Sequence, residues 1–113
     1  MSPTDKPLVW LDGIGSPPFS REALVEAGYL LRRLQQGEKL ALPHSETMPE
    51  IGPRCHQLRI RDSAHNWRIV YRIDADAIVV VLVFAKTTKT TPRAEIETAK
   101  RRLKEYDKAA EGD

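Results

Sequence analysis

Four arginines carry the most distinctive chemistry in this sequence, and they lie on two neighbouring segments in which residue types alternate. In residues 58–61 (LRIR) and 67–73 (WRIVYRI), apolar side chains take every second position. Side chains of a β-strand point alternately to its two faces, so one face is expected to be apolar and the other basic. The arginines expected on the basic face are Arg59, Arg61, Arg68 and Arg72. Guanidinium groups stay charged at physiological pH and offer phosphate oxygens a planar fork of donors, so the pattern favours a phosphate-binding surface.

The positive charge is concentrated in the middle third of the chain. The net charge is only +2, yet residues 52–92 contain seven Lys and Arg against three Asp and Glu. Lys86 and Lys89 follow the last strand-like segment and extend the basic surface along its rim. A basic patch on an otherwise neutral small protein is typical of a phosphate-bearing partner. The alternative is that exposed strands carry charged side chains for solubility and edge protection, and the sequence leaves both open.

Other kinds of catalytic chemistry find little support in the sequence. Cys55 and His56 are adjacent and would point to opposite faces of a strand, so they are poorly placed as a nucleophile and its base. His56 shares the apolar face with Leu58, which predicts a structural role. His44 and His65 fall in a loop and a turn, where either could touch a ligand. One cysteine and three scattered histidines give no metal-ligand spacing, so neither a metal nor a cofactor is expected.

The acidic and aromatic residues also give little support to other kinds of site. Asp62, Asp74 and Asp76 all fall in predicted turns, so no carboxylate pair is prepared for acid–base work, and an active site here would be cationic. Trp67 and Tyr71 lie at strand spacing with the apolar set, which favours core positions over platforms for stacking bases.

The first half of the chain predicts a strand, a helix and a long loop. Residues 8–11 (LVWL) form a short apolar run, and the turn residues that follow reach Pro18. Ser20 is placed to cap a helix with an apolar stripe that ends at Gly37. Gly28 in the middle of this helix predicts a break or a close packing contact. Residues 42–54 have no period, and their prolines and glycine argue against a regular element there.

The second half predicts three strands and a helix. Residues 58–61, 67–73 and 78–84 (IVVVLVF) are joined by short turns and form an antiparallel meander, with the last strand buried on both faces. Thr91 and Pro92 start a helix whose apolar stripe runs to Tyr106. We therefore expect one α+β domain over residues 1–113, ordered from about 6 to 106. Its antiparallel sheet has about four strands, and the N-terminal and C-terminal helices pack on one face.

Composition sets limits on location. No apolar run approaches the roughly 20 residues that span a bilayer, and residues 1–7 lack the features of a secretory signal. A single cysteine excludes an internal disulfide. These features predict a cytoplasmic protein with no membrane partner.

Four segments in order together resemble a known family. They are 58–61 (LRIR), 67–72 (WRIVYR), 83–86 (VFAK), and Thr91–Pro92 opening a helix that ends in residues 99–106 (AKRRLKEY). Their order and spacing are similar to those of the phage-derived, HigB-like toxins of the RelE/ParE superfamily in bacterial type II toxin–antitoxin systems. The resemblance covers nearly the whole chain, from about residue 6 to residue 106.

The resemblance implies a RelE-like fold and a function. Such a toxin enters the decoding site of the ribosome and cleaves messenger RNA without a metal ion, by attack of a ribose 2′-hydroxyl on the adjacent phosphate. A small helix-turn-helix, HigA-like antitoxin holds it inactive and provides the only link to DNA. Basic residues on a sheet face suit this chemistry, because positioning and charge stabilisation need only well-placed cations.

The resemblance also assigns roles to residues. Arg68 matches the family's strand arginine and would bind the scissile phosphate. Lys86 matches the lysine after the last strand and would stabilise the transition state or transfer a proton. The residues that would bind flanking phosphates are Arg59, Arg61, Arg72 and Lys89.

The sequence departs from the family in two places, and both affect the catalytic assignment. Thr87 stands where many relatives have a second basic residue, and the next positive charge is displaced to Lys89. The tyrosine near the C-terminus of RelE is missing. Arg93 falls in that region, and Tyr71 is the strand alternative if it points outward. The general base is therefore unassigned.

Two other function classes remain open at this point. A non-catalytic RNA- or ribosome-binding module would use the same arginine face without cleavage. A protein-interaction module would use it to dock an acidic partner.

Overall fold

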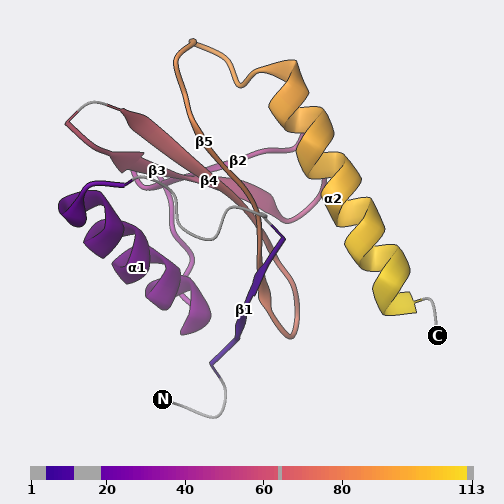
Figure 1. The fold of residues 1–113 in the computed structure, drawn as a ribbon. Coiled ribbons are helices and arrows are strands. Elements are labelled where there is room, and N and C mark those ends of the chain that lie inside the picture. The colour runs from indigo at the N-terminus through magenta and orange to yellow at the C-terminus, as the bar shows by residue number, and fades with distance from the viewer. Residues whose placement is uncertain (1–4, 12–18, 64, 112–113) are drawn as a thin grey trace.

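The computed structural model describes residues 5–11, 19–63 and 65–111, and they form five strands and two helices (Figure 1). The strands are β1 (Leu8–Trp10), β2 (Ser45–Thr47), β3 (Cys55–Arg61), β4 (Asn66–Ile73) and β5 (Ile78–Ala85), and the helices are α1 (Arg21–Gln35) and α2 (Arg93–Glu111). The predicted α+β class is confirmed. The turn predicted before Ser20 falls on residues 12–18, which lie outside the described residues.

The strands form one mixed sheet in the order β1-β5-β4-β3-β2. The predicted antiparallel meander of β3, β4 and β5 is present, and β1 adds to it in parallel beside β5. The fifth strand, β2, pairs antiparallel with β3. Sequence reasoning missed β2 because it is three residues long and lies between Pro43 and Pro49, in a stretch without periodicity.

The prediction that both helices cover one face of the sheet is wrong. Residues of α1 pack on one face, and Ala99 and Leu103 of α2 pack on the other (Figure 1). The reason lies in β5, where every residue from Ile78 to Phe84 is buried. An apolar strand with two buried faces requires cover on both sides of the sheet.

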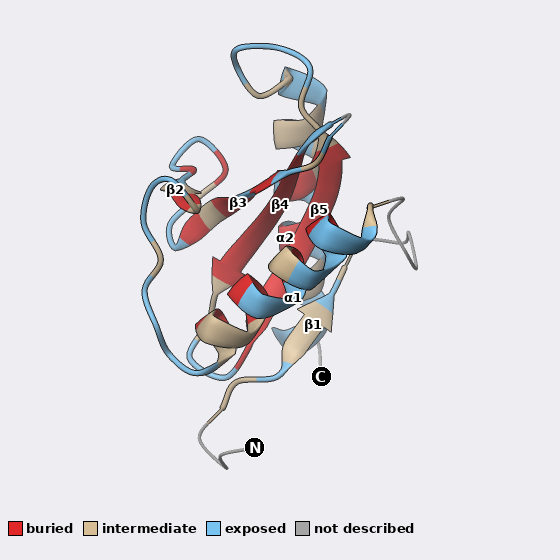
Figure 2. Ribbon diagram, turned by 90° about the vertical axis from the view of Figure 1, so that its left-hand side faces the viewer, coloured by how far each residue is buried: buried red, intermediate tan, exposed pale blue. Residues whose placement is uncertain are grey.

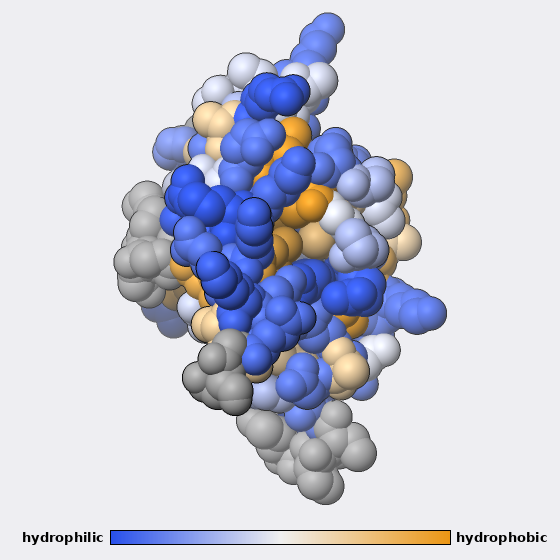
Figure 3. Space-filling model, turned by 90° about the vertical axis from the view of Figure 1, so that its right-hand side faces the viewer, coloured by the Kyte–Doolittle hydropathy of each residue, from blue (hydrophilic) through white to orange (hydrophobic). Residues whose placement is uncertain are grey.

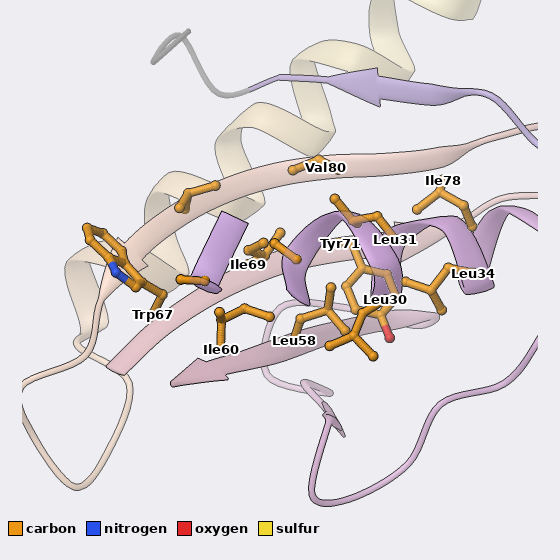
Figure 4. Packing of buried hydrophobic residues seen from close by; sticks show 13 residues of the cluster. Leu30, Leu31, Leu34, Leu58, Ile60, Trp67, Ile69, Tyr71, Ile78 and Val80 are labelled. Carbon is orange, nitrogen blue, oxygen red and sulfur yellow. The ribbon is translucent and has the colours of Figure 1, made fainter. Parts of the chain in front are cut away.

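The core under α1 contains the apolar face predicted for β3 and β4. Leu58, Trp67 and Tyr71 meet the buried stripe of α1, and Figure 4 shows Tyr71 beside Leu30 and Leu34. The Tyr71 hydroxyl lies 2.6 Å from the Ser45 hydroxyl, so β2 closes this core. Apolar burial of this kind contributes roughly 25 cal/mol per Å², which makes these contacts the main support of the sheet.

α2 covers the other face over β5 and is tied to the sheet by charge. Arg72 is 8% exposed, and its guanidinium donates to Asp74 and to Asp107 of α2, with the shortest bond to each at 2.7 Å. These two carboxylates raise the pKa of Arg72, with Asp107 the larger influence. Hydrophilic residues form a band on this side of the molecule, with hydrophobic residues exposed beside it (Figure 3). α2 runs to Glu111, so it is longer than the stripe ending at Tyr106 predicts.

α1 begins as predicted. Ser20 caps it by accepting a hydrogen bond from the Ala23 backbone N–H, and the helix ends beside Gly37, whose φ is 92°. Asp62 in the β3–β4 turn accepts from the Ser20 backbone N–H at 2.9 Å and from the Trp67 indole at 3.3 Å. Through Asp62, the start of α1 is held to the meander.

Neither helix in the described ranges is both long and apolar enough to cross a membrane.

Asp62 predicts a dependence of stability on pH. Its hydrogen bonds, chiefly that from Ser20, lower its pKa from 3.8 to about 2. A carboxylate with a lowered pKa stabilises the folded state above its unfolded value, and this stabilisation is lost as the pH falls from 3.8 towards 2. Asp62→Asn should remove that part of the acid dependence in urea unfolding. Asp76→Asn, in the exposed β4–β5 turn, is the matched control and should keep it.

Arg72→Met should lower the free energy of unfolding by about 2 kcal/mol, because it leaves two carboxylates without their partner. Urea unfolding measures this directly. The matched control is Arg101→Met, which removes an exposed pair to Glu105 at 3.8 Å and should change stability by less than about 0.5 kcal/mol. Equal effects of the two substitutions would contradict the structural role of Arg72.

Candidate functional site

The register of the sheet brings three of the four predicted arginines together with Lys86. Arg59 on β3 lies opposite Arg68 on β4, and the next row pairs Arg61 with Asn66. The Lys86 backbone N–H donates to the Asn66 carbonyl at 2.7 Å, which extends the second row across β5. We call Arg59, Arg61, Arg68 and Lys86 the cationic cluster.

Surface hollows join the members of the cationic cluster. Arg59, Arg61 and Arg68 line a depression of about 350 Å³, together with His44 and Asn66. Arg61 and Lys86 line an adjoining one of about 520 Å³ that also includes Asn66. Because Arg61 and Asn66 belong to both, the two hollows form one surface at the end of the sheet.

A bulge in β5 determines which face Lys86 occupies. The register runs from Val70 opposite Leu82 to Tyr71 opposite Val80, so Val81 is the extra residue. Val81 and Leu82 consequently both pack on the α2 side. Strict alternation from Ile78 would send Lys86 to the α1 side, and the extra residue reverses this. Arg102 of α2 donates to the Val81 carbonyl at 2.9 Å and so braces the bulge.

Arg68 is a buried cation whose hydrogen-bond donors are only partly paired. Its side chain is 7% exposed, one terminal nitrogen donates to the Trp67 carbonyl at 3.2 Å, and its buried Nε has no partner. Burial lowers the pKa of Arg68, and the charge of Arg59 directly across the ladder lowers it further. Like charges opposite each other destabilise a sheet, so the pair costs the fold free energy unless an anion binds.

Glu46 is the one carboxylate in ion-pair range of the cationic cluster among the described residues. One of its oxygens accepts from the Gln57 amide at 3.0 Å, and the other lies 3.9 Å from an Arg59 nitrogen. Gln57 is 1% exposed, and its Oε1 has no partner. Glu26 of α1 also lines the first hollow and Asp62 lines the second, so Glu46 is one of three carboxylates around the cationic cluster.

Arg72 shares the strand face of Arg68 but is occupied by Asp74 and Asp107, so its donors are not free for phosphate. Tyr71 points into the core under α1 and is 1% exposed, because strand alternation places it opposite Arg72. Tyr71 therefore cannot replace the missing C-terminal tyrosine from the outer face of the strand.

Lys89, in the β5–α2 loop, and Arg93, the first residue of α2, are exposed and do not line the two hollows.

The residues for which the sequence favours no direct chemical role, His56, Cys55 and Trp67, lie in or against the core. His56 lies on the α1 side and stacks on the Tyr71 ring at 5.3 Å, where burial lowers its pKa. Cys55 points to the other face, is buried, and has a pKa raised by burial. Trp67 is a core residue. Across the described parts of the chain, no three His, Cys, Asp or Glu residues gather where a metal ion could bind.

Sequence reasoning missed three residues at this site, and it named a fourth, His44, as a loop residue that could touch a ligand. Gln57 shares its face with Arg59, and the same alternation that located the arginines predicts its position. Asn66 lies one residue before the predicted strand. His44 and Glu46 come from the region of β2, where no periodic signal exists.

The cost of burying the Arg68 charge can be measured as a change in the free energy of unfolding. Arg68→Met keeps the aliphatic volume and removes a buried, incompletely paired charge opposite Arg59, so the free energy of unfolding should rise by about 1 kcal/mol. Denaturant unfolding at low salt tests this against Arg93→Met, which should be neutral. A loss of stability would mean that Arg68 belongs to the structural framework.

Comparison with known families gives a match that covers most of the chain. The model of the family described as Phage derived protein Gp49-like (DUF891) matches residues 18–104, which include both helical cores and the whole cationic cluster. Comparison with curated proteins found no match. The phage-derived resemblance is thereby confirmed, while the assignment to HigB within it stays a prediction. The chain belongs to the phage-derived Gp49-like protein family.

Proposed function

We propose that this protein is the toxin component of a type II toxin–antitoxin system and cleaves messenger RNA on the ribosome. The observation that carries the proposal is the opposed pair of Arg59 and Arg68, with a buried donor left unpaired. Membership of the Gp49-like family, a RelE/HigB-like toxin family, supports it. A strained cation site is typical of a functional surface, and a phosphate is the anion that arginine forks fit best.

The chemistry requires no group beyond those of the chain and the RNA. The 2′-hydroxyl loses its proton and attacks the adjacent phosphorus, while the bond from phosphorus to the 5′ oxygen breaks. Arg68 binds the scissile phosphate and offsets the charge that develops on its oxygens. Lys86 lies at the far end of the cationic cluster. Its ammonium group stabilises the leaving 5′ oxygen or donates a proton to that oxygen.

Other basic residues hold the rest of the strand. Arg59 and Arg61 are exposed beside Arg68 and bind flanking phosphates. Lys89 and Arg93 contact the nucleic acid further out, where the β5–α2 loop enters α2. Arg72 has no part in this scheme, because Asp74 and Asp107 occupy it.

Glu46 is the proton acceptor that the geometry favours. Its hydrogen bond from Gln57 fixes one oxygen, and the second oxygen faces Arg59, within the region where the phosphate would lie. His44 lines the same hollow and is the second candidate.

The proposal carries a partner and a location with it. An antitoxin with a helix-turn-helix domain would hold the toxin inactive, and messenger RNA on cytoplasmic ribosomes would be its substrate.

Mapping of new messenger RNA 5′ ends in a reconstituted translation reaction tests the proposal. The wild-type protein should produce cuts that require programmed ribosomes. Arg68→Met should lower the cleavage rate by about 10²-fold or more, because it removes the principal phosphate contact. Glu46→Gln should lower the rate while leaving ribosome binding intact. Arg101→Met, on the outer surface of α2, is the matched control and should cut like wild type.

Cofractionation with ribosomes separates the alternatives. Ribosome binding that depends on Arg68 without any cleavage would replace the enzyme with a non-catalytic RNA-binding module. Neither binding nor cleavage would favour the protein-interaction module.

A further inference from the structure

Two surfaces outside the cationic cluster are left open by the elements of the described chain. On α1, Leu24, Val25 and Tyr29 are exposed. Gly28 lies among them, the helix continues through it without a break, and a Cβ there would meet no atom within 4 Å. Both roles that the sequence predicts for Gly28 are therefore absent, and nothing in the described residues indicates what covers this surface. The second surface is a groove beside α2, and its charges do indicate an occupant.

The groove runs along α2 on the side of the sheet opposite α1. In Figure 2, α1 lies in front of the buried strands and α2 behind them. Residues of α2 from Glu97 to Glu111 form one wall of the groove and residues 51–55 the other, around a volume of about 1010 Å³. At about 1.5 Å per residue, the α2 wall spans roughly 21 Å. This length suits a segment of polypeptide better than a small molecule, which binds in a pocket that encloses most of its surface.

Three lysines of α2 line the groove in a single row. Lys100, Lys104 and Lys108 are four residues apart and follow one another along one side of the helix, and we call them the lysine row. All three are exposed, and among the described residues none of them has an ion-pair partner. Like charges at this spacing destabilise a helix. The row therefore lowers the stability of the chain unless an acidic group binds there.

Arg54 adds a positive charge from the opposite wall. Its φ is 64°, a conformation that is strained for a residue other than glycine, and such residues gather at functional sites. Its Nε donates to the Ile73 carbonyl at 3.1 Å, and a terminal nitrogen lies 3.5 Å from Asp74, which Arg72 already binds at 2.7 Å. The Arg54 side chain is 58% exposed, so its charge is accessible to a ligand in the groove.

The floor of the groove is apolar. Ile51, Cys55 and Leu103 line the groove and are buried. An occupant that matches this floor supplies apolar side chains beside its charged ones, as an amphipathic helix does.

The order of charges along α2 favours a protein segment over a nucleic acid. Glu97 and Glu111 lie at the two ends of the lysine row, and Asp107 beside the row is held by Arg72. A nucleic acid carries a charge on every nucleotide, so its backbone would meet the terminal carboxylates. The described residues that line the groove also include no aromatic ring on which a base could stack.

We propose that this groove binds an acidic amphipathic helix of another protein. The lysine row repeats about once per helical turn, so a helix lying along α2 presents its carboxylates in step with the row. Carboxylates in the middle of that helix pair with the lysine row and Arg54, and its apolar side chains contact the floor. The residues that line the groove differ from those that line the two hollows of the cationic cluster, so this inference does not depend on the proposed function.

Selection from a displayed library of helical peptides of about 15 residues tests the proposal. The wild-type chain should enrich peptides with carboxylates one helical turn apart beside an apolar stripe. Fluorescence anisotropy of the most enriched peptide then gives its affinity for each variant. Lys104→Glu, at the centre of the lysine row, should weaken binding at least about tenfold. Lys39→Glu, at an exposed position after α1, is the matched control and should bind like wild type.

Neither substitution should lower the Tm, because both lysines are exposed. A chain in which Lys100→Glu, Lys104→Glu and Lys108→Glu are combined should enrich basic peptides in the same selection. Enrichment of no acidic sequence by the wild-type chain overturns the proposal. Equal affinity of the Lys104→Glu and Lys39→Glu variants, or an unchanged preference of the triple variant, also overturns it.

Two further measurements identify other occupants, and either result would overturn the proposal. An RNA oligonucleotide that displaces the peptide, and that Lys104→Glu weakens equally, would assign the groove to nucleic acid. A dimer in sedimentation velocity that Lys104→Glu abolishes would assign the groove to a second copy of this chain.

Discussion

The arrangement of this protein depends on the two-sided burial of β5. Seven consecutive apolar residues leave neither face of this strand available to solvent, so one helix is needed on each side of the sheet. α1 provides one cover and α2 the other, and β1 and β4 flank the strand on its edges. α2 packs over β5, and the cationic cluster lies at the ends of β3 and β4, where its hollow also reaches Glu26 of α1.

Arginines on one strand face have opposite roles according to the carboxylates around them. Arg72 meets Asp74 and Asp107, becomes the tie between sheet and helix, and stabilises the fold. Arg68, four residues earlier on the same face, lies opposite another arginine and keeps an unpaired donor. Nearly equal burial thus produces a structural residue in one case and a binding residue in the other. The difference arises from side chains contributed by distant parts of the chain.

The sequence predicts the parts of the fold that follow local periodicity. Alternation in β3 and β4 placed the arginines opposite Leu58 and Ile60, and the helix signals located Ser20 and the start of α2. What it could not predict arises from contacts between segments remote in sequence. Asp107 is an ordinary helix residue until α2 packs beside Arg72, and Glu46 joins the site only because β2 pairs with β3. The opposite faces of the helices also follow from tertiary packing, which propensity does not encode.

The extra residue at Val81 links the length of β5 to everything that follows it. Upstream of the bulge, even-numbered residues face α1, and downstream they face α2. Gain or loss of one residue in β5 would therefore move the side chains that follow it, as far as Lys86, to the other face of the sheet. Substitutions along β5 that keep its length leave Lys86 in place, whereas a change of length would move Lys86 to the other side of the sheet.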